Sequence, residues 1–290
     1  MLALKLAFKN LLGAGLRTWL NVSILSFAFV LIIFYNGLLD GWNRQGIKDT
    51  KEWEIGEGQF WHPEYDELDP FTIQDAHAPL SEKIQKLVNE NKLTPILISE
   101  ATAYPQGRMR SVVLKGIDPK QTISKIPSAG LETTEKGTFA IIGKRMAEAT
   151  KLKEGDNMLV RWRDKNGTYD AREIQIAAIF KCNVPPVDNG QIYVSLDVLQ
   201  EMTNMPNEAT LLVTSKDFEG GELENWAFKD LDFLLKDFHA LISAKKGGAS
   251  IMQIVLLVLA LLAIFDTQVL SIFRRQKEIG TYIAMGMTRF

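Results

Sequence analysis

Two long uncharged runs dominate the hydrophobic pattern of this chain. Residues 18–39 contain no charged side chain and are bounded by Arg17 and Asp40, and residues 247–273 contain Asp266 alone. About 20 helical residues cross a hydrocarbon core of ~30 Å, so each run is long enough to be a transmembrane helix. A buried helix of a globular core is the alternative, but such helices are shorter and seldom apolar all round. The first run also lacks the small-residue cleavage site of a signal peptide.

The stretch before the first run has a different pattern. Residues 1–17 place their apolar side chains on one helical face, with Lys5 and Lys9 on another. A basic amphipathic helix of this kind suits the inner surface of a membrane, and we expect it to lie there before the chain turns to cross. A fraying cytoplasmic start is the alternative.

Residues 40–246 show the shorter periods of a folded domain. Runs rich in Val and Ile, bounded by Gly, Pro, Asn and Asp, predict strands at 95–104, 110–118, 156–164, 171–180, 190–195 and 209–215. Helical patterns open at Ser81, Gly143 and Leu196, and Asn166-Gly167 predicts a hairpin turn. The aromatic, acidic and proline-punctuated stretch 60–70 predicts a loop. We therefore expect a mixed α+β domain.

The end of this domain is predicted to be one amphipathic helix over residues 222–246. Leu223, Trp226 and Leu234 recur in it at helical spacing, and it leads directly into the second uncharged run. We interpret it as a helical stalk between the domain and the bilayer.

The charges beside the two runs predict the topology. The basic residues at the two membrane boundaries are Lys5, Lys9, Arg17, Arg274, Arg275 and Lys277. Positive flanks stay in the cytoplasm, so both ends of this segment are expected inside and residues 40–246, with their net negative charge, outside. We expect a multi-pass protein of a bacterial inner membrane, with a cytoplasmic element over residues 274–290. The single cysteine, Cys182, excludes an intrachain disulfide and agrees with a bacterial membrane.

The signals for an enzyme are weak. The histidines lack metal-ligand spacing, and they are His62, His77 and His239. Residues 137–145 resemble a phosphate-binding loop only loosely, because the two glycines are separated by five residues and Arg145 replaces the usual Ser or Thr. We interpret Gly143 as a strand-to-helix turn. No catalytic, cofactor-binding or metal site is therefore expected in this chain.

Asp266 is the one charge inside a predicted span. It lies eight residues before Arg274, so about 12 Å inside the cytoplasmic end at ~1.5 Å per residue. A carboxylate there should face protein or water, or be protonated. It is either a proton or substrate site or, as we favour, a polar contact across the helices with Asn21 or Ser23.

The stretch RRQKEIGTYIAMGMTR (274–289) resembles the segment after the second span in permeases of the lipoprotein-releasing (LolC/LolE), MacB and FtsX-like superfamily of ABC transporters. KLAFKNLLGAGLRTWLNV, SVVLKGIDP, IIGKRMAEATKLKEGDNMLV and NWAFKDLDFLLKDF are similar to further stretches of that family, in the same order. The family has four spans, and this segment contains two. We therefore expect further spans beyond it or on another chain.

The resemblance implies a non-catalytic permease subunit. A separate ATPase dimer, which would carry ATP and Mg, would close and push the tail, and the spans would transmit this to the periplasmic domain. The expected ATPase contact consists of Glu278, Ile279, Gly280, Ile283, Ala284, Met285, Gly286 and Met287. Other expected partners are a second permease subunit, identical or related, and a periplasmic cargo, with no nucleic acid.

Lipoprotein release is the first choice of activity, and export of a peptide or small molecule is the second. A two-span sensor with an outer ligand-binding domain is an alternative of another class. It fits the same topology and predicts a signalling segment after the second span.

Overall fold

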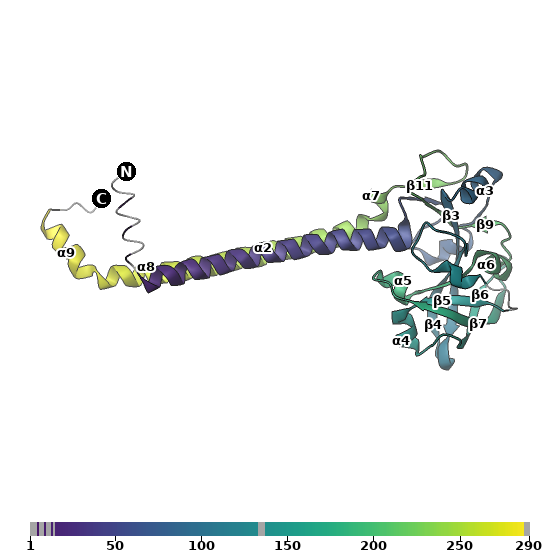
Figure 1. The fold of residues 1–290 in the computed structure, drawn as a ribbon, viewed down its shortest axis with the longest axis horizontal. Coiled ribbons are helices and arrows are strands. Elements are labelled where there is room, and N and C mark those ends of the chain that lie inside the picture. Colours follow the sequence, from purple (N-terminus) through teal and green to yellow (C-terminus); the bar gives the residue numbers. More distant parts are fainter. Residues whose placement is uncertain (1–4, 6–8, 10–12, 14, 133–136, 287–290) are drawn as a thin grey trace. The chain divides into compact units, whose positions relative to one another are not determined.

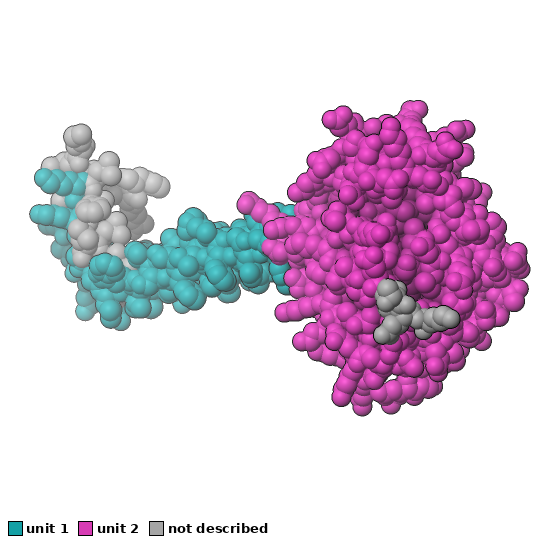
Figure 2. All heavy atoms as spheres, turned by 45° about the vertical axis from the view of Figure 1, so that its right-hand side comes forward, with its two compact units in different colours: residues 1–43, 239–290 teal, residues 44–238 magenta. Residues whose placement is uncertain are grey.

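The computed structural model describes residues 5, 9, 13, 15–132 and 137–286. The chain divides into two compact units, unit 1 (residues 1–43 and 239–290) and unit 2 (residues 44–238), shown in Figure 2. Most of the amphipathic helix expected over residues 1–17 lies outside the described residues, as does Met287.

The helices are labelled as in Figure 1 and have the following bounds: α2 (Leu16–Thr50), α3 (Glu82–Asn89), α4 (Lys144–Thr150), α5 (Pro185–Asn189), α6 (Leu196–Thr203), α7 (Leu231–Leu234), α8 (Lys236–Arg274) and α9 (Gln276–Ala284). The π-helix η1 covers Lys51–Ile55, and the 3-10 helices are η2 (Pro70–Gln74), η3 (Pro105–Gly107) and η4 (Ser128–Leu131). The strands are β1 (Gln59–Trp61), β2 (Ala78–Pro79), β3 (Leu93–Tyr104), β4 (Arg110–Ile117), β5 (Phe139–Gly143), β6 (Asn157–Arg163), β7 (Tyr169–Phe180), β8 (Gln191–Ser195), β9 (Glu208–Ala209), β10 (Leu211–Thr214) and β11 (Ala227–Lys229).

A closed barrel forms the centre of unit 2. The main sheet has the order β11-β1-β10-β3-β4-β8-β5-β7-β6, and a further pairing of β3 with β6 joins β6 back to β3. The long strand β3 makes this possible, because its first residues pair with β10 and its last residues pair with β6. β4–β8 and β5–β7 are parallel pairs, so the barrel is mixed. Closure gives β6 a neighbour on both sides, so β11 is left as the edge strand of this sheet.

Alternation along the strands fills this barrel. In β6 the side chains of Met158, Val160 and Trp162 are buried, and the residues between them are exposed. This is the period of two that a strand requires. The helices α4 and α6 contribute Met146 and Leu199 to the same apolar cluster. The barrel is therefore a packed core.

The strands expected from the pattern are confirmed as β3, β4, β6, β7, β8 and β10, each with ends within two residues of the expected ones. The hairpin turn at Asn166-Gly167 joins the antiparallel pair β6–β7. Gly143 ends β5 and precedes α4, as expected for a strand-to-helix turn. A Cβ atom there would overlap the backbone of Asp188, so glycine is required by close approach.

The prediction of a single helix over residues 222–246 is wrong for its first part. Residues 227–229 form β11, which pairs with β1, and the separate short helix α7 follows. Asp230 starts α7 by accepting a hydrogen bond from the backbone N–H of Phe233 at 2.8 Å. Trp226 is buried in a cluster with Phe60 instead of lying on a helical face. The long helix of the stalk is α8, which begins at Lys236.

The prediction of a loop over residues 60–70 is also wrong for its first two residues. Phe60 and Trp61 belong to β1, where they pair with Leu212 and Leu211 of β10. Both side chains are buried. The histidine and proline that follow do end the strand at Trp61.

In unit 1, the parts of α2 and α8 lie side by side and antiparallel (Figure 1). Three polar pairs join the two helices: Asn21–Thr267, Asn36–Gln253 and Asp40–Lys246. The residue numbers of the partners increase along α2 and decrease along α8, so the two helices are antiparallel. Both helices are long and apolar enough to cross a membrane, and only 11% of each apolar window is buried. Helices of a soluble core would be mostly buried, so these apolar side chains face the surroundings of the chain.

Candidate functional site

The expected ATPase contact lies mainly on α9, a short helix that begins after Arg275. Ile279, Tyr282 and Ile283 are 42%, 51% and 39% exposed and recur at the spacing of one helical face. Gly280 lies next to them, and a Cβ atom there would meet nothing within 4 Å. α9 therefore offers an uncovered apolar stripe beside a position without a side chain.

The remaining residues of this expected contact follow closely. Glu278 forms an ion pair with Arg275 at 3.4 Å, where both side chains are largely exposed. Ala284 ends α9, Met285 is 70% exposed, and Gly286 has a positive φ of 94°. The chain thus leaves the helix at Gly286, since a positive φ is readily adopted by glycine.

The expected boundary residues lie on helices or between them. Arg274 is the last residue of α8, and Arg275 separates α8 from α9. Lys277 lies in the first turn of α9, and its carbonyl oxygen accepts a hydrogen bond from the Thr281 hydroxyl at 3.0 Å. Lys5 and Lys9 are helical and exposed. Arg17 belongs to α2.

The polar contact expected inside the membrane exists, but with a different partner. Asn21 donates a hydrogen bond from Nδ2 to the hydroxyl oxygen of Thr267 at 2.9 Å. The hydroxyl of Thr267 in turn reaches the carbonyl oxygen of Ile264 at 2.7 Å. Asp266, one residue earlier, is exposed and has no partner among the described residues. Adjacent helical residues point about 100° apart, so Thr267 faces α2 while Asp266 does not.

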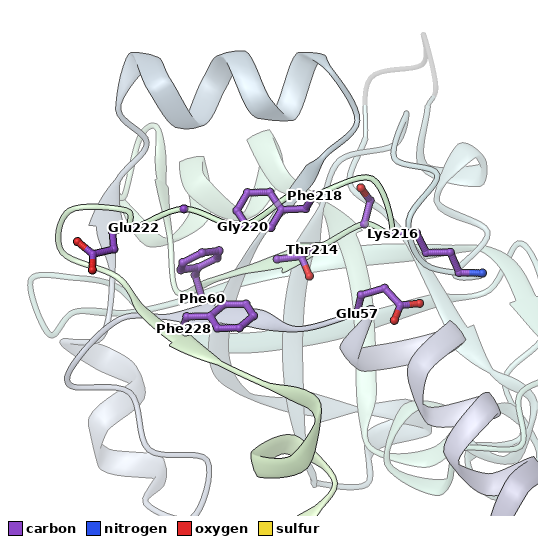
Figure 3. A pocket seen from close by; sticks show the side chains of 10 residues that line it. Glu57, Phe60, Thr214, Lys216, Phe218, Gly220, Glu222 and Phe228 are labelled. Carbon is purple, nitrogen blue, oxygen red and sulfur yellow. The ribbon is translucent and has the colours of Figure 1, made fainter.

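Unit 2 carries a cavity that the sequence did not indicate, which we call the aromatic pocket. It has a volume of about 680 Å³ and is lined by Phe60, Phe218 and Phe228 (Figure 3). The ring of Phe60 lies 4.9 Å from that of Phe228 and 5.6 Å from that of Phe218, between ring centres. The three rings come from β1, from β11 and from the loop after β10.

Charged side chains surround the aromatic pocket. Figure 3 shows Glu57 and Lys216 beyond one end of the rings and Glu222 at the other. Gly220 and Gly221, with positive φ, shape the loop that carries Phe218. The pocket has the lining of a binding site for an apolar group, and the described residues that line it include no histidine and no cysteine. Only the pairing of β11 with β1 brings Phe228 to Phe60, which no local pattern reveals.

Two buried titratable groups of another apolar cluster, Cys182 and Tyr193, are not arranged for catalysis. Burial raises the pKa of the Tyr193 hydroxyl well above its ordinary value, and it also raises the pKa of the Cys182 thiol. Tyr193 donates its hydrogen bond to Gln191 Oε1. A buried thiol with a raised pKa is a poor nucleophile, so Cys182 is part of the core.

Neither a protein-family model nor a curated protein matches this chain. Among solved structures, the extracellular domain of the noncanonic ABC-type transporter YknZ from Gram-positive bacteria is similar at 14% identity, with a TM-score of 0.33, over 63% of this chain and 94% of that domain. The periplasmic region of MacB from Actinobacillus actinomycetemcomitans is similar at 10% identity, with a TM-score of 0.39, over 64% and 94%.

Proposed function

We propose that this chain is the transmembrane subunit of an ABC transporter, and that it works by MacB/FtsX-like mechanical coupling. A separate ATPase dimer binds ATP and Mg, closes and pushes on α9. The helices α2 and α8 carry this movement across the membrane to the α+β domain. Both ends of the segment are then cytoplasmic, and the domain is periplasmic.

The exposed stripe on α9 is the observation that carries this proposal. Ile279, Tyr282 and Ile283 present apolar surface directly after Arg274 and Arg275, which end a helix long enough to span a membrane. An ordinary basic flank explains the two arginines but not an apolar stripe in an aqueous compartment. A partner that covers the stripe explains both.

The polar pairs between α2 and α8 support the mechanical part. Asn21–Thr267 and Asn36–Gln253 tie the helices at separate levels, and Asp40–Lys246 ties them at 2.8 Å near one end of the first uncharged run. Hydrogen bonds between apolar helices fix their register, since sliding would leave each polar group unpaired. The two helices then move as one body when α9 is pushed.

The cargo remains a separate part of the proposal. Lipoprotein release, the first choice from the sequence, has no specific support in the comparisons, and export of a peptide or small molecule fits the same mechanism. The aromatic pocket suits an apolar group of either class, because its three phenylalanines offer ring surface and its volume is that of a small-molecule site. A second permease subunit, identical or related, completes the proposed transporter.

Capture of the ATPase from the membranes of the source cell tests the proposal. Affinity-tagged full chain is purified in mild detergent, and bound proteins are identified by mass spectrometry. We expect an ATP-binding subunit with a Walker motif to be captured by the wild type and lost with Gly280→Trp. A Cβ atom at Gly280 would meet no atom of the described residues within 4 Å, so α9 has space for a larger side chain at this position.

Gly280→Ala is the matched control. Alanine favours a helix over glycine by about 1 kcal/mol, so this variant keeps α9 and adds only a methyl group. It should capture the ATPase as the wild type does. Equal capture by Gly280→Trp would refute the contact, and capture of a signalling protein instead of an ATPase would favour the two-span sensor.

A further inference from the structure

A second cavity in unit 2 has a charged lining, and we call it the basic pocket. It has a volume of about 780 Å³ and lies wholly within residues 44–238. The end of α2 with η1, the loop 122–125 and the segment after β10 line it. Its cationic side chains are Arg44, Lys48, Lys51, Lys125 and Lys216, and its acidic ones are Glu52, Glu57 and Asp217. Cations therefore outnumber carboxylates.

Two of the carboxylates are already paired inside the lining. Lys51 forms an ion pair with Glu57, with 2.6 Å between nitrogen and oxygen, and Lys125 forms one with Glu52 at 2.7 Å. The hydrogen bond from Lys125, with the charges of Lys48 and Lys216, lowers the pKa of Glu52. Lys48 and Lys216 are far apart in the sequence, yet the charges of both act on the Glu52 carboxylate.

Three cations of the lining are left over. Within the described part of the chain, Arg44, Lys48 and Lys216 form no ion pair, and one unpaired carboxylate, Asp217, lies among them. Like charges that are gathered without partners repel one another. An anion in the basic pocket would relieve this repulsion.

A neutral donor completes the lining. Ser215 Oγ accepts a hydrogen bond from the backbone N–H of Asp217 at 3.2 Å, which leaves its own hydrogen free to donate. Ammonium, guanidinium and hydroxyl groups are the donors that phosphate oxygens accept from. The lining therefore suits a phosphate group better than a carboxylate, which has fewer oxygens.

The position of these cations along the chain indicates where the phosphate comes from. Arg44 follows Asp40, which ends the first uncharged run, by four residues. Four residues reach about 14 Å at most even when fully extended, so this limit holds however the two units are placed. The headgroup layer of a bilayer is about 5–8 Å thick on each side of the core. Arg44 is thus tethered within reach of that layer, provided that residues 18–39 cross the membrane, as in the proposed function.

We propose that the basic pocket binds the phosphate of an anionic phospholipid of the surrounding bilayer. Arg44, Lys48 and Lys216 supply the charge, and Ser215 supplies a hydroxyl donor. The bound headgroup would hold unit 2 at the membrane surface. Free phosphate offers the same oxygens but no hydrocarbon for the apolar side chains of the lining, Ile47 and Ile123, so it should bind much more weakly.

Binding to the full chain in neutral detergent tests this assignment. The probes are dihexanoyl phosphatidylglycerol, dihexanoyl phosphatidylcholine and inorganic phosphate, each titrated calorimetrically below its micellar concentration. We expect binding of phosphatidylglycerol alone. The double variant Lys48→Gln/Lys216→Gln should weaken it by about three- to tenfold, as expected for two exposed charge contacts.

Two further variants make the result specific. Lys86→Gln/Lys153→Gln removes two exposed lysines of unit 2 that do not line the pocket, and its affinity should stay within about twofold of the wild type. Lys48→Arg/Lys216→Arg keeps the charges and should keep binding. Equal binding of phosphatidylcholine or of inorganic phosphate would overturn the lipid assignment, and full binding by the glutamine pair would overturn the site.

This test and the ATPase test fail separately. The glutamine pair should still capture the ATPase, because the pocket does not include α9. Gly280→Trp should still bind phosphatidylglycerol. Loss of both in one variant would indicate misfolding, which the thermal unfolding midpoint of that variant would reveal, and the arginine pair then decides the proposal.

Discussion

The end of helix α6 provides the sharpest prediction about stability. A helix leaves its last four carbonyl groups without helical partners. Here Gln200 accepts from the N–H of Met205 at 2.9 Å and Glu201 from that of Asn204 at 3.3 Å. Thr203 accepts from the N–H of Lys165 at 3.0 Å. Every one of these donors belongs to the backbone.

Met202 is the exception. The residue four positions later is Pro206, which has no N–H. The indole Nε1 of Trp162, from β6 inside the barrel, donates to the Met202 carbonyl at 2.6 Å instead. Both groups are buried. Trp162→Phe therefore leaves a buried acceptor unpaired and a small void beside it.

The cost follows from these two losses. An unpaired buried acceptor costs about 1–3 kcal/mol, and the smaller ring adds about 1 kcal/mol of lost apolar contact. We expect Trp162→Phe to destabilise unit 2 by about 3 kcal/mol. At about 2–4 °C per kcal/mol for a domain of this size, the unfolding midpoint should fall by about 6–12 °C.

Scanning calorimetry of the full chain in detergent measures this shift, with Trp226→Phe as control. Trp226 is also buried, but its indole has no hydrogen-bond partner among the described residues. Trp226→Phe should therefore lose only the apolar contact that the smaller phenylalanine ring cannot make, which costs about 1 kcal/mol. If the two variants lower the midpoint equally, the hydrogen bond to Met202 contributes nothing and the reasoning is refuted.

Three further predictions concern other parts of the chain. A double-mutant cycle of Asn21→Leu and Thr267→Val should give a coupling of about 0.6 kcal/mol, and no more than about 1.7, in detergent-denaturation experiments; zero coupling would remove the hydrogen bond from the account of the helix pair. Gly143→Ala should destabilise unit 2 by about 1–3 kcal/mol in denaturant unfolding, because its Cβ overlaps the Asp188 backbone, whereas Gly130→Ala, with its nearest atom at 3.7 Å, should change little. The Asp164 carboxylate accepts hydrogen bonds from the backbone N–H of Thr168, the side-chain amide of Asn204 and the backbone N–H of Asn166, and these bonds lower its pKa below the ordinary 3.8. The stability that this carboxylate contributes is thus present above pH 3.8 and lost as pH falls through its folded pKa. Asp164→Asn should therefore lower the unfolding midpoint at pH 7 and lower it progressively less below pH 3.8. A difference in midpoint between the wild type and the variant that stays constant from pH 7 to about 2.5 would contradict this.

Much of the local structure is determined by the sequence itself. Helical and strand periods are local properties, so the runs of Val and Ile located six strands to within two residues, and the absence of charge located two helices able to cross a membrane. In these cases neighbouring side chains alone decide the outcome. The sequence did not indicate that residues 276–284 form a helix, α9.

The tertiary structure decided what depends on distant partners. Residues 222–235 have a helical pattern, yet β11 forms because the edge of β1 offers backbone hydrogen bonds that a helix there would leave unused. The closure of the barrel through β3 and β6, the three rings of the aromatic pocket and the meeting of Lys48 with Lys216 all join segments far apart in the sequence. From the sequence, Asn21 could pair with Asp266 or with Thr267. It pairs with Thr267 because that side of α8 is turned toward α2. A pattern of single residues carries the period of each element, but pairing and register arise from packing energies summed over many contacts, which no local stretch contains.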